Sequence, residues 1–569
     1  MLLDAGAQVD QRDLIANYTP LHWAASSERS SPAVVELLIA RGADANAEGG
    51  QNVDNYLGVA QTPLSLARKR GDTPIVRALL KAGAKDLPTA APTAKTMQQA
   101  SARIGSKTAA EAVQRALLPL TKTCEESVST FLRHASKQDC ISCHQQQVPL
   151  AALSLAHSRH FATDRGATRH QIELLKRSFL TGHIQNQHTI QEVNLQTTFH
   201  PEPAIFAGYA SMNFHLEHEP ASALTDGMVH QLAAIQHADG HWSWNLPRQP
   251  IQASDITATA QAVYTLKSYG IPARRQELAS RIQQARTWLT TARAETNEER
   301  VHQLLGLAWG GEKPVALKEF VEALLREQRP HGGWGQLVGL DSDAYATGQS
   351  LYALIEGGKV SASDPALRRG VDFLLRTQFA DGTWHVRTRA HPFQPPMASG
   401  FSHGRDGWIS AAGTSWAVMA LATSLDPTQV PTTTLAVAKS AAAAPAVAAN
   451  EAGNTEPPVE FTRDIQPLLE RSCVACHSGE RAKGGFQVVD RRSLLQGGKR
   501  GEPAVIPGKP DASPLLRLVQ DQVEDLEMPP LGKREKFPAL TKDEIGKLSG
   551  WIVQGANWPQ GATLHVPGK

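Results

Sequence analysis

Apolar residues recur at helical spacing through most of this chain, and this pattern predicts a mainly α protein. Near the C-terminus, Ile545, Leu548 and Trp551 lie three residues apart and form one apolar face. A much longer helical stretch is predicted from residue 111 to 425, and it contains apolar helices such as 255–266. The spacing therefore predicts helices packed on helices as the architecture of the chain.

Two turn sequences near the N-terminus are related. Residues 19–25 are Thr-Pro-Leu-His-Trp-Ala-Ala and residues 62–67 are Thr-Pro-Leu-Ser-Leu-Ala, and each leads into an apolar helix and a Gly. This pattern resembles ankyrin repeats, with about ten residues more than their roughly 33-residue period. We place the insertion in residues 48–58. The resemblance implies a repeat array over residues 1–86 that packs against or docks a protein partner.

A second repeat follows, in which a Gln stands six positions before a Trp with a Gly between them. The three clear copies are residues 236–242, 328–334 and 378–384, and a degenerate copy over 288–309 gives a period of about 46–50 residues. These copies resemble the repeats of squalene cyclases and prenyltransferases, which form an α/α toroid. The resemblance covers residues 231–425, with weaker repeats back to 117. It implies that Gln and Trp tie successive helix pairs together.

The toroid resemblance predicts a fold and leaves the activity open. Squalene-type cyclases of this family protonate substrate with D-x-D-D, and isoprenyl-diphosphate synthases bind metal through D-D-x-x-D, but neither string occurs in this sequence. Residues 341–344 lack the last carboxylate, and Asp343 is expected to cap a helix. A zinc site like that of protein prenyltransferases would have only Cys124 to draw on. Terpene cyclisation therefore rests on fold analogy alone.

Four of the five cysteines lie in two C-x-x-C-H motifs, the attachment signature of c-type haem. Two thiols one helical turn apart form thioethers with the haem vinyl groups, and the adjacent histidine ligates the iron. We therefore predict two covalent haems c. The predicted attachment and iron-binding residues are Cys140, Cys143 and His144 in the first motif and Cys473, Cys476 and His477 in the second.

Two other uses of paired cysteines fit less well. The C-x-x-C pairs of a zinc ribbon lie about 15–20 residues apart, whereas these two motifs stand on either side of a linker. A thioredoxin-like redox pair needs a strand, a turn and a helix, and neither flank resembles a buried strand. Five cysteines in 569 residues also cannot form a disulfide scaffold.

The second motif lies in a predicted small all-α domain over residues 459–560. A helix from residue 461 leads to the motif, and Met528 follows it and precedes two prolines. Met is a frequent partner of His in cytochromes c, although a Met can also simply fill a core. The run from 461 to 551 resembles the cytochrome c domain of planctomycete-type bacterial proteins, which implies electron transfer with His477 and Met528 as axial ligands.

The sixth ligand of the first haem stays open at the level of sequence. We test His403 first, because it lies in a Gly-flanked polar loop between apolar helices. A vacant sixth position is the alternative. The remaining candidates are His157, His160, His200 and Met397.

Charge and hydropathy exclude some partners. Lys and Arg number 57 and Asp and Glu 55, so the net charge of +2 predicts no nucleic-acid partner. No apolar run approaches the eighteen or so residues of a membrane-spanning helix. The predicted domains are ankyrin repeats (1–86), a linker (87–110), the toroid (111–425), an Ala/Pro/Thr-rich linker (426–458) and a cytochrome c domain (459–560).

These features together predict a dihaem c-type cytochrome that exchanges electrons with a redox partner protein in the cell envelope. Haem is attached to such motifs on the extracytoplasmic side, so we expect a periplasmic or other extracytoplasmic location. Residues 1–7 match the end of a repeat, and we expect a signal peptide upstream of them. The alternatives are a haem-assisted oxidoreductase or terpene-cyclase-like enzyme in the toroid cavity, and a scaffold built on the ankyrin array.

Overall fold

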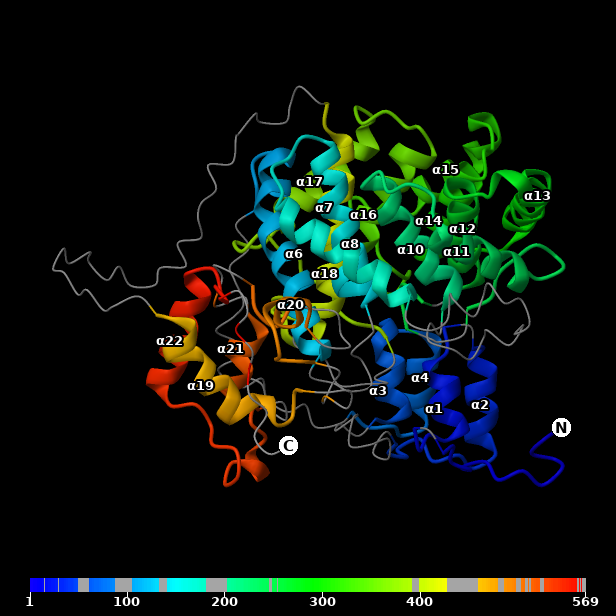
Figure 1. Cartoon of the computed structure of the whole chain (residues 1–569). Coiled ribbons are helices and arrows are strands. Elements are labelled where there is room, and N and C mark those ends of the chain that lie inside the picture. Colours follow the sequence, from blue (N-terminus) through cyan, green and yellow to red (C-terminus); the bar gives the residue numbers. More distant parts are fainter. Residues whose placement is uncertain are drawn as a thin grey trace. The chain divides into compact units, whose positions relative to one another are not determined.

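A computed structural model of the chain is mainly α (Figure 1). In the described part of the chain the only β pairings are three isolated bridges, and the predicted fold class is confirmed. Cys140, His200, Met397 and most of both predicted linkers lie outside the described residues. The described residues are 1–14, 16–28, 30–49, 61–86, 105–132, 141–180, 202–244, 248–252, 254–390, 399–426, 459–478, 482, 486–497, 503–506, 510, 513–521, 527–559, 562 and 564.

The chain divides into two compact units, Met1–Ala438 and Lys439–Lys569. No helix within the described ranges combines the length and the apolar character that crossing a membrane requires. In the first unit the ankyrin-like residues and the toroid each enclose an apolar core of their own.

Four short helices form the ankyrin-like part: α1 (Pro20–Ser26), α2 (Pro32–Ala40), α3 (Pro63–Ala67) and α4 (Pro74–Lys81). Each begins with a Pro, whose missing N–H costs nothing in the first helical turn. His22, in the first turn sequence, hydrogen-bonds to both ankyrin-like copies. His22 Nδ1 lies 2.9 Å from Thr19 Oγ1, and its Nε2 lies 3.1 Å from the carbonyl oxygen of Gln61 at the start of the second copy.

Six helices form the inner ring of the toroid. Each packs against the next, and the last packs against the first. The residues of these helices are buried on nearly all sides, which explains why their sequences, apart from the polar first turns of α14, are mostly apolar or small around the whole helix. The inner helices are α7 (Val148–Ser158), α10 (Pro203–Leu216), α12 (Asp255–Ser268), α14 (Asn297–Trp309), α16 (Ala344–Tyr352) and α18 (Gly407–Ser424).

The outer helices of the toroid alternate with the inner ones along the described chain. Contacts between their first turns show that neighbouring inner helices begin at the same end of the ring: Glu298 of α14 bonds to Tyr345 of α16, and His144, just before α7, meets Trp408 of α18. The first outer helix packs against the last, which closes the outer layer. The outer helices are α6 (Ala109–Leu132), α8 (Arg165–Leu180), α11 (Ala223–Ile235), α13 (Arg275–Thr291), α15 (Lys318–Arg326) and α17 (Pro365–Thr377).

The Gln–Trp repeats make the same bonds three times. The indole Nε1 atoms of Trp242, Trp334 and Trp384 each donate, at 2.8 Å, to a carbonyl oxygen ten residues earlier in the preceding outer helix. The Gln side chain of each copy donates to the Gly of its own turn and to a carbonyl of the following outer helix. Gln378 closes the circle, because its partner at 2.9 Å is Ala112 in α6. The partners of Gln236 and Gln328 are Arg281 and Ala366.

Asp343 is the N-cap of α16, as expected. Its carboxylate accepts hydrogen bonds from the backbone N–H of Ala346 at 2.9 Å and from Gln336 Nε2 at 2.7 Å. Burial raises the pKa of this carboxyl to about 6, although both hydrogen bonds act in the opposite direction. The carboxylate that most resembles a cyclase motif thus has a structural role in starting a helix.

The second unit contains short helices around a small core. A helical stretch formed by η10 (Phe461–Ile465), α19 (Gln466–Leu469) and η11 (Glu470–Val474) packs against α22 (Lys542–Val553). The rings of Phe461 and Trp551 lie 5.8 Å apart at this contact. The first and last helices of the unit therefore pack together, as the apolar pattern predicts. The other helices are α20 (Arg491–Gln496), α21 (Pro514–Val519) and η14 (Leu531–Lys533).

Candidate haem sites

The first C-x-x-C-H motif lies at the beginning of an inner helix of the toroid. Cys143 and His144 open η3 (Cys143–Gln147), which continues directly into α7. The Ser142 hydroxyl caps this start by accepting a hydrogen bond from the backbone N–H of Gln145 at 3.1 Å. The motif therefore stands at the end of the ring where the inner helices begin.

His144 is enclosed by the toroid. Its side chain is 5% exposed, and its ring meets the Trp408 ring edge to face at 4.5 Å. Burial, together with the nearby Arg248, lowers the pKa of His144 to about 3, so the imidazole is neutral. Its Nε2 is buried and has no hydrogen-bond partner among the described residues. A buried polar atom without a partner costs about 1–3 kcal/mol, and a bond to iron would remove that cost. The residue fits the role of a haem ligand.

Cys124, the cysteine outside both motifs, lies beside the first one. Its Sγ is 3.8 Å from the carbonyl oxygen of Gln146, and the side chain is buried. Burial raises the pKa of this thiol far above its ordinary value. The Sγ of Cys143 is contacted at 3.6 Å by Gln147 Nε2. Sequence spacing gave no reason to place Cys124 next to the motif, because the two segments meet only through helix packing.

The second motif ends the first helical stretch of the C-terminal unit. The backbone N–H of His477 bonds to the carbonyl of Cys473 at 3.1 Å, and His477 Nδ1 lies 3.2 Å from the carbonyl oxygen of Phe486. A proton on Nδ1 completes that second bond and leaves Nε2 as the metal-binding nitrogen, which is how ligating histidines are usually oriented. Burial raises the pKa of the Cys473 thiol to about 12, with a smaller contribution from Cys476. This motif also fits a haem.

Met528 belongs to the same core as the second motif. Its backbone N–H bonds to the carbonyl of Leu518 at 3.0 Å, and its half-buried side chain packs against the apolar cluster that Cys473 and Phe486 also contact. The structure thus brings both predicted ligand segments, His477 and Met528, to one core. The assignment of Met528 as the axial ligand stays a prediction.

The described candidates for the sixth ligand of the first haem differ in position. His157 is exposed at the far end of α7, about 20 Å along the helix from His144 at 1.5 Å per residue. His160 is also exposed. His403 precedes α18 by a few residues, at the end where Trp408 contacts His144, and its Nε2 lies 2.8 Å from Thr383 Oγ1. Position therefore favours His403 among these three.

Sequence reasoning missed a group of buried polar residues inside the ring. Asn297, Glu298 and Glu299 open α14 and are all buried. In the sequence they resemble the acidic first turn of an exposed helix, and nothing in their spacing indicates burial. Only the closure of the ring places Glu298 in the interior.

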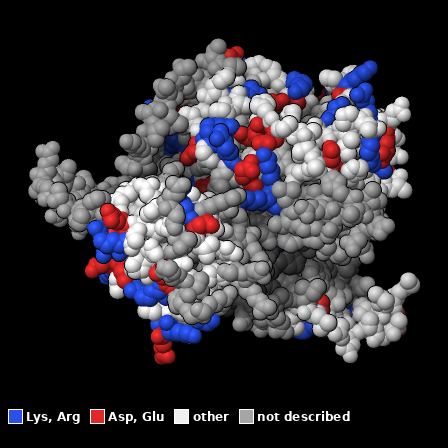
Figure 2. Space-filling view, in the orientation of Figure 1, with Lys and Arg blue, Asp and Glu red and all other residues white. Residues whose placement is uncertain are grey.

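Charged side chains on the described part of the visible face are interspersed, with Lys and Arg next to Asp and Glu (Figure 2). The chain has nearly equal numbers of basic and acidic residues, 57 and 55. On this face the two kinds of charge are also mixed locally (Figure 2). Within the described ranges, no three His, Cys, Asp or Glu side chains gather in a way that could hold a metal ion.

The fold and the motifs define a mainly α protein of several domains with a c-type haem-binding region. Three family models match separate parts of the chain: ankyrin repeat over residues 16–49, squalene-hopene cyclase C-terminal domain over 294–435, and planctomycete cytochrome c over 473–532. These matches confirm the predicted combination of regions. A comparison with curated protein sequences found no match.

Solved structures with similar folds include the type II terpene cyclase MstE from Scytonema. Its complex with the product merosterolic acid A is 14% identical over 55% of this chain and 99% of the cyclase, with a TM-score of 0.34. Its apo form is 14% identical over 54% and 98%, with a TM-score of 0.31. A protein from Actinoplanes is 14% identical over 54% and 99%, with a TM-score of 0.33. Likeness at this level carries no information about activity.

Proposed function

We propose that this protein is a dihaem c-type cytochrome that transfers electrons in the cell envelope. The observation that carries the proposal is the state of the two motif histidines. The buried Nε2 of His144 has no partner in the part of the chain that the structure describes, and His477 is oriented through Nδ1 by a backbone carbonyl. The match to planctomycete cytochrome c supports haem binding in the second motif.

Haem c supplies one-electron transfer at each site. In the second site, Cys473 and Cys476 would fix the group, His477 and Met528 would ligate the iron, and the Phe486 carbonyl holds the His477 ring. A Met thioether donates less electron density to iron than a second histidine would. Ligation by Met528 would therefore raise the reduction potential of this haem. Cys140, Cys143 and His144 would hold the first haem at the start of α7.

Location and partners follow from the same chemistry. Covalent haem of this type is attached outside the cytoplasm, so we place the protein in the periplasm or an equivalent compartment. The half-exposed Cys476 and His477 give a redox partner protein access to the second haem. The ankyrin-like helices offer a separate surface for a protein partner.

A pyridine haemochrome assay of the full chain, produced in a host that matures c-type haem, tests the proposal. We expect two covalent haems per chain. The pairs Cys140→Ala/Cys143→Ala and Cys473→Ala/Cys476→Ala should each remove one haem, whereas the control Cys124→Ala should retain both. A wild-type chain that folds and carries one haem or none would show that the dihaem assignment is wrong.

The potential of the second haem tests its axial ligand. Met528→Ala should lower it by on the order of 0.1 V, within the range of about 0.8 V that axial ligands control. The haem content should stay at two, because the thioether cysteines are unchanged. An unchanged potential would mean that Met528 fills the core and does not ligate the iron.

A haem-assisted oxidoreductase in the toroid is a second candidate function. The observation in its favour is the set of buried polar atoms without partners inside the ring, because an interior without chemistry would be apolar. Rapid binding of carbon monoxide to the reduced toroid haem would show an open coordination site. If wild type does not bind carbon monoxide but His403→Ala does, His403 is the sixth ligand and electron transfer remains the function.

A further inference from the structure

The inner ring holds an acid that is shielded from solvent. Glu298, in the first turn of α14, is 2% exposed. Its Oε2 accepts a hydrogen bond from the Tyr345 hydroxyl at 2.8 Å, and Gln349 Nε2 donates to that hydroxyl oxygen at 3.1 Å. Helices α14 and α16 are therefore joined by a chain of three polar side chains.

A histidine continues this chain on the next turn of α14. His302 is fully buried, and its Nδ1 lies 3.0 Å from the backbone carbonyl oxygen of Glu298 and 3.1 Å from its Oε1. A proton on Nδ1 fits this arrangement and leaves Nε2 to accept from Gln261 Nε2, 3.3 Å away on α12. Three neighbouring inner helices thus contribute to one hydrogen-bonded cluster.

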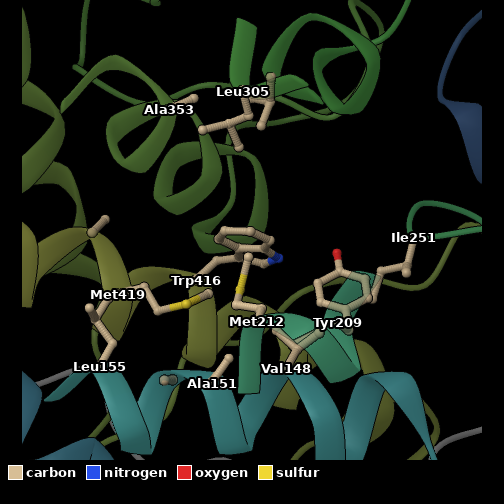
Figure 3. Packing of buried hydrophobic residues seen from close by; sticks show 14 of the residues in the cluster. Val148, Ala151, Leu155, Tyr209, Met212, Ile251, Leu305, Ala353, Trp416 and Met419 are labelled. Carbon is tan, nitrogen blue, oxygen red and sulfur yellow. The ribbon is translucent and has the colours of Figure 1, made fainter. Parts of the chain in front are cut away.

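Several polar atoms around the cluster have no partner among the described residues. They are the hydroxyl of Tyr209, the Oε1 atoms of Gln261 and Gln349, and the indole Nε1 of Trp416. Figure 3 shows the Trp416 nitrogen and the Tyr209 hydroxyl turned toward the same space. Each atom left unpaired would cost about 1–3 kcal/mol, so they indicate sites for water that joins the cluster into a continuous path for a proton.

The cluster is uncharged at neutral pH. Burial, with a smaller contribution from the charge of Glu299, raises the pKa of Glu298 to about 8. The hydrogen bonds from Gln349 and Tyr345 lower this pKa by less than burial raises it. Burial lowers the pKa of His302 to about 4. Burial also raises the pKa of Tyr209 and Tyr345, which stay protonated. The Glu299 carboxylate is engaged at the start of the helix, where it accepts from the backbone N–H of Thr296 at 2.9 Å.

Helix α10 connects the cluster to the first haem motif. Tyr209 of α10 lies near both sites, because Glu298 and the free Cys143 thiol are the neighbours that, after burial, raise its pKa. One turn further on, Asn213 Nδ2 donates to the carbonyl oxygens of Tyr209 at 2.9 Å and Gln147 at 3.0 Å. Helix α10 therefore lies beside both the acid and the helix that carries the motif.

We propose that Glu298 is the proton-exchanging group of the toroid and takes up one proton when an electron arrives at the haem held by Cys143 and His144. This inference rests on the proposed function, because it requires a haem at the first motif. The electron comes from a one-electron donor, which in the proposed function is the haem of the second motif. The proton comes from solvent, and at pH values above the pKa of the oxidised state it converts the Glu298 carboxylate into the neutral acid.

The physical reason is the cost of an uncompensated charge in a dry interior. An added electron makes the haem site more negative by one charge, and nearby charges interact strongly when little water screens them. The neutral acid then becomes more stable than the carboxylate, and the pKa of Glu298 rises on reduction. Protons are taken up at pH values between the pKa of the oxidised state and that of the reduced state. Within this window the reduction potential falls as pH rises.

Redox titration of the toroid haem at several pH values tests the proposal. We use the full chain carrying Cys473→Ala/Cys476→Ala, so that only the first haem is present. One proton per electron corresponds to a tenfold change in electron affinity per pH unit, or 59 mV for a one-electron couple. We expect a slope approaching this limit above pH 8, and we expect Glu298→Gln to abolish it. Glu322→Gln, an exposed change of the same chemistry on α15, should leave it intact.

The outcomes separate the two proposals. Absence of haem from this chain contradicts the proposed function. Haem with a pH-dependent potential that Glu298→Gln leaves unchanged overturns the role of Glu298 and leaves the proposed function standing. Infrared spectroscopy gives an independent readout, because the C=O stretch of a protonated carboxylic acid at pH 7 should be missing in Glu298→Gln. Its presence at equal strength in Glu298→Gln also contradicts the inference.

Discussion

The two C-x-x-C-H motifs have the same pattern of cysteines and histidine and opposite surroundings. His144 lies inside a closed ring of helices and is 5% exposed, whereas His477 is half-exposed in a small unit. Water can screen a change of charge at the second motif. The first motif must rely on protein groups for that purpose, and a buried acid is available there. The comparison teaches that the same short motif can stand in two different environments, one enclosed by helices and one partly open to water.

The two regions also differ in how their helices are stabilised. Each inner helix of the toroid packs against two others. In the C-terminal unit, α19 has four residues and α21 has six, and helices this short are not stable without tertiary contacts. We therefore expect the stability of the second unit to depend more on a bound haem than that of the toroid.

The largest expected effect comes from removing each haem in turn. Cys473→Ala/Cys476→Ala should abolish the cooperative unfolding transition of the C-terminal unit, because the haem supplies much of what its short helices pack against. Cys140→Ala/Cys143→Ala should leave the toroid folded, with a lower melting temperature. Calorimetry and limited proteolysis distinguish the two results. A C-terminal unit that still unfolds cooperatively without haem would break the comparison.

The buried tryptophans test whether the two units unfold separately. Trp334→Ala removes a fully buried ring and its bond to Leu324, and it should destabilise the toroid by about 3–5 kcal/mol. Trp551→Ala should act in the same way on the C-terminal unit alone. Thermal unfolding followed at the absorbance of each haem provides the measurement. A change in both transitions from either substitution would contradict separate unfolding.

The pH dependence of stability sharpens the contrast at the first motif. The pKa of Glu298 is raised from 4.5 to about 8 in the folded chain, so the folded state holds a proton that the unfolded state releases. Stability of the wild type should therefore fall as pH rises from 4.5 to 8, by at most about 1.4 kcal/mol per pH unit. Glu298→Gln should lack this component and gain relative stability toward pH 8. Parallel slopes for Glu298→Gln and wild type in chemical denaturation would contradict the buried neutral acid.

The smallest effect is expected for Cys124→Ala. The Sγ contact of 3.8 Å with the Gln146 carbonyl is weak, and the substitution leaves a small cavity, so the loss should be about 1 kcal/mol. The visible spectrum of the first haem should stay the same. A shifted spectrum would show that Cys124 influences the iron, and the role of the first motif would then extend beyond its own residues.

Local sequence rules determined much of this protein. The Gln–Trp copies predicted the toroid and the bonds that close it, because the hydrogen bonds of each copy start within one short turn. The threonine-capped turns at 19 and 62 predicted the ankyrin-like helices for the same reason. The cysteine spacing predicted both attachment sites, since a C-x-x-C-H motif needs only one helical turn.

Tertiary structure alone decided what surrounds those motifs. Burial of His144 depends on Trp408, more than 250 residues away in the chain, and the neutral state of Glu298 depends on its burial, which outweighs the hydrogen bonds from Tyr345 and Gln349. Closure of the ring decides both, because desolvation is a property of everything packed around a group. The spacing of residues along the chain does not reveal the desolvation of a group. The sequence by itself determined the two predicted attachment motifs, and the packing of the helices decided that His144 is buried while His477 is partly exposed.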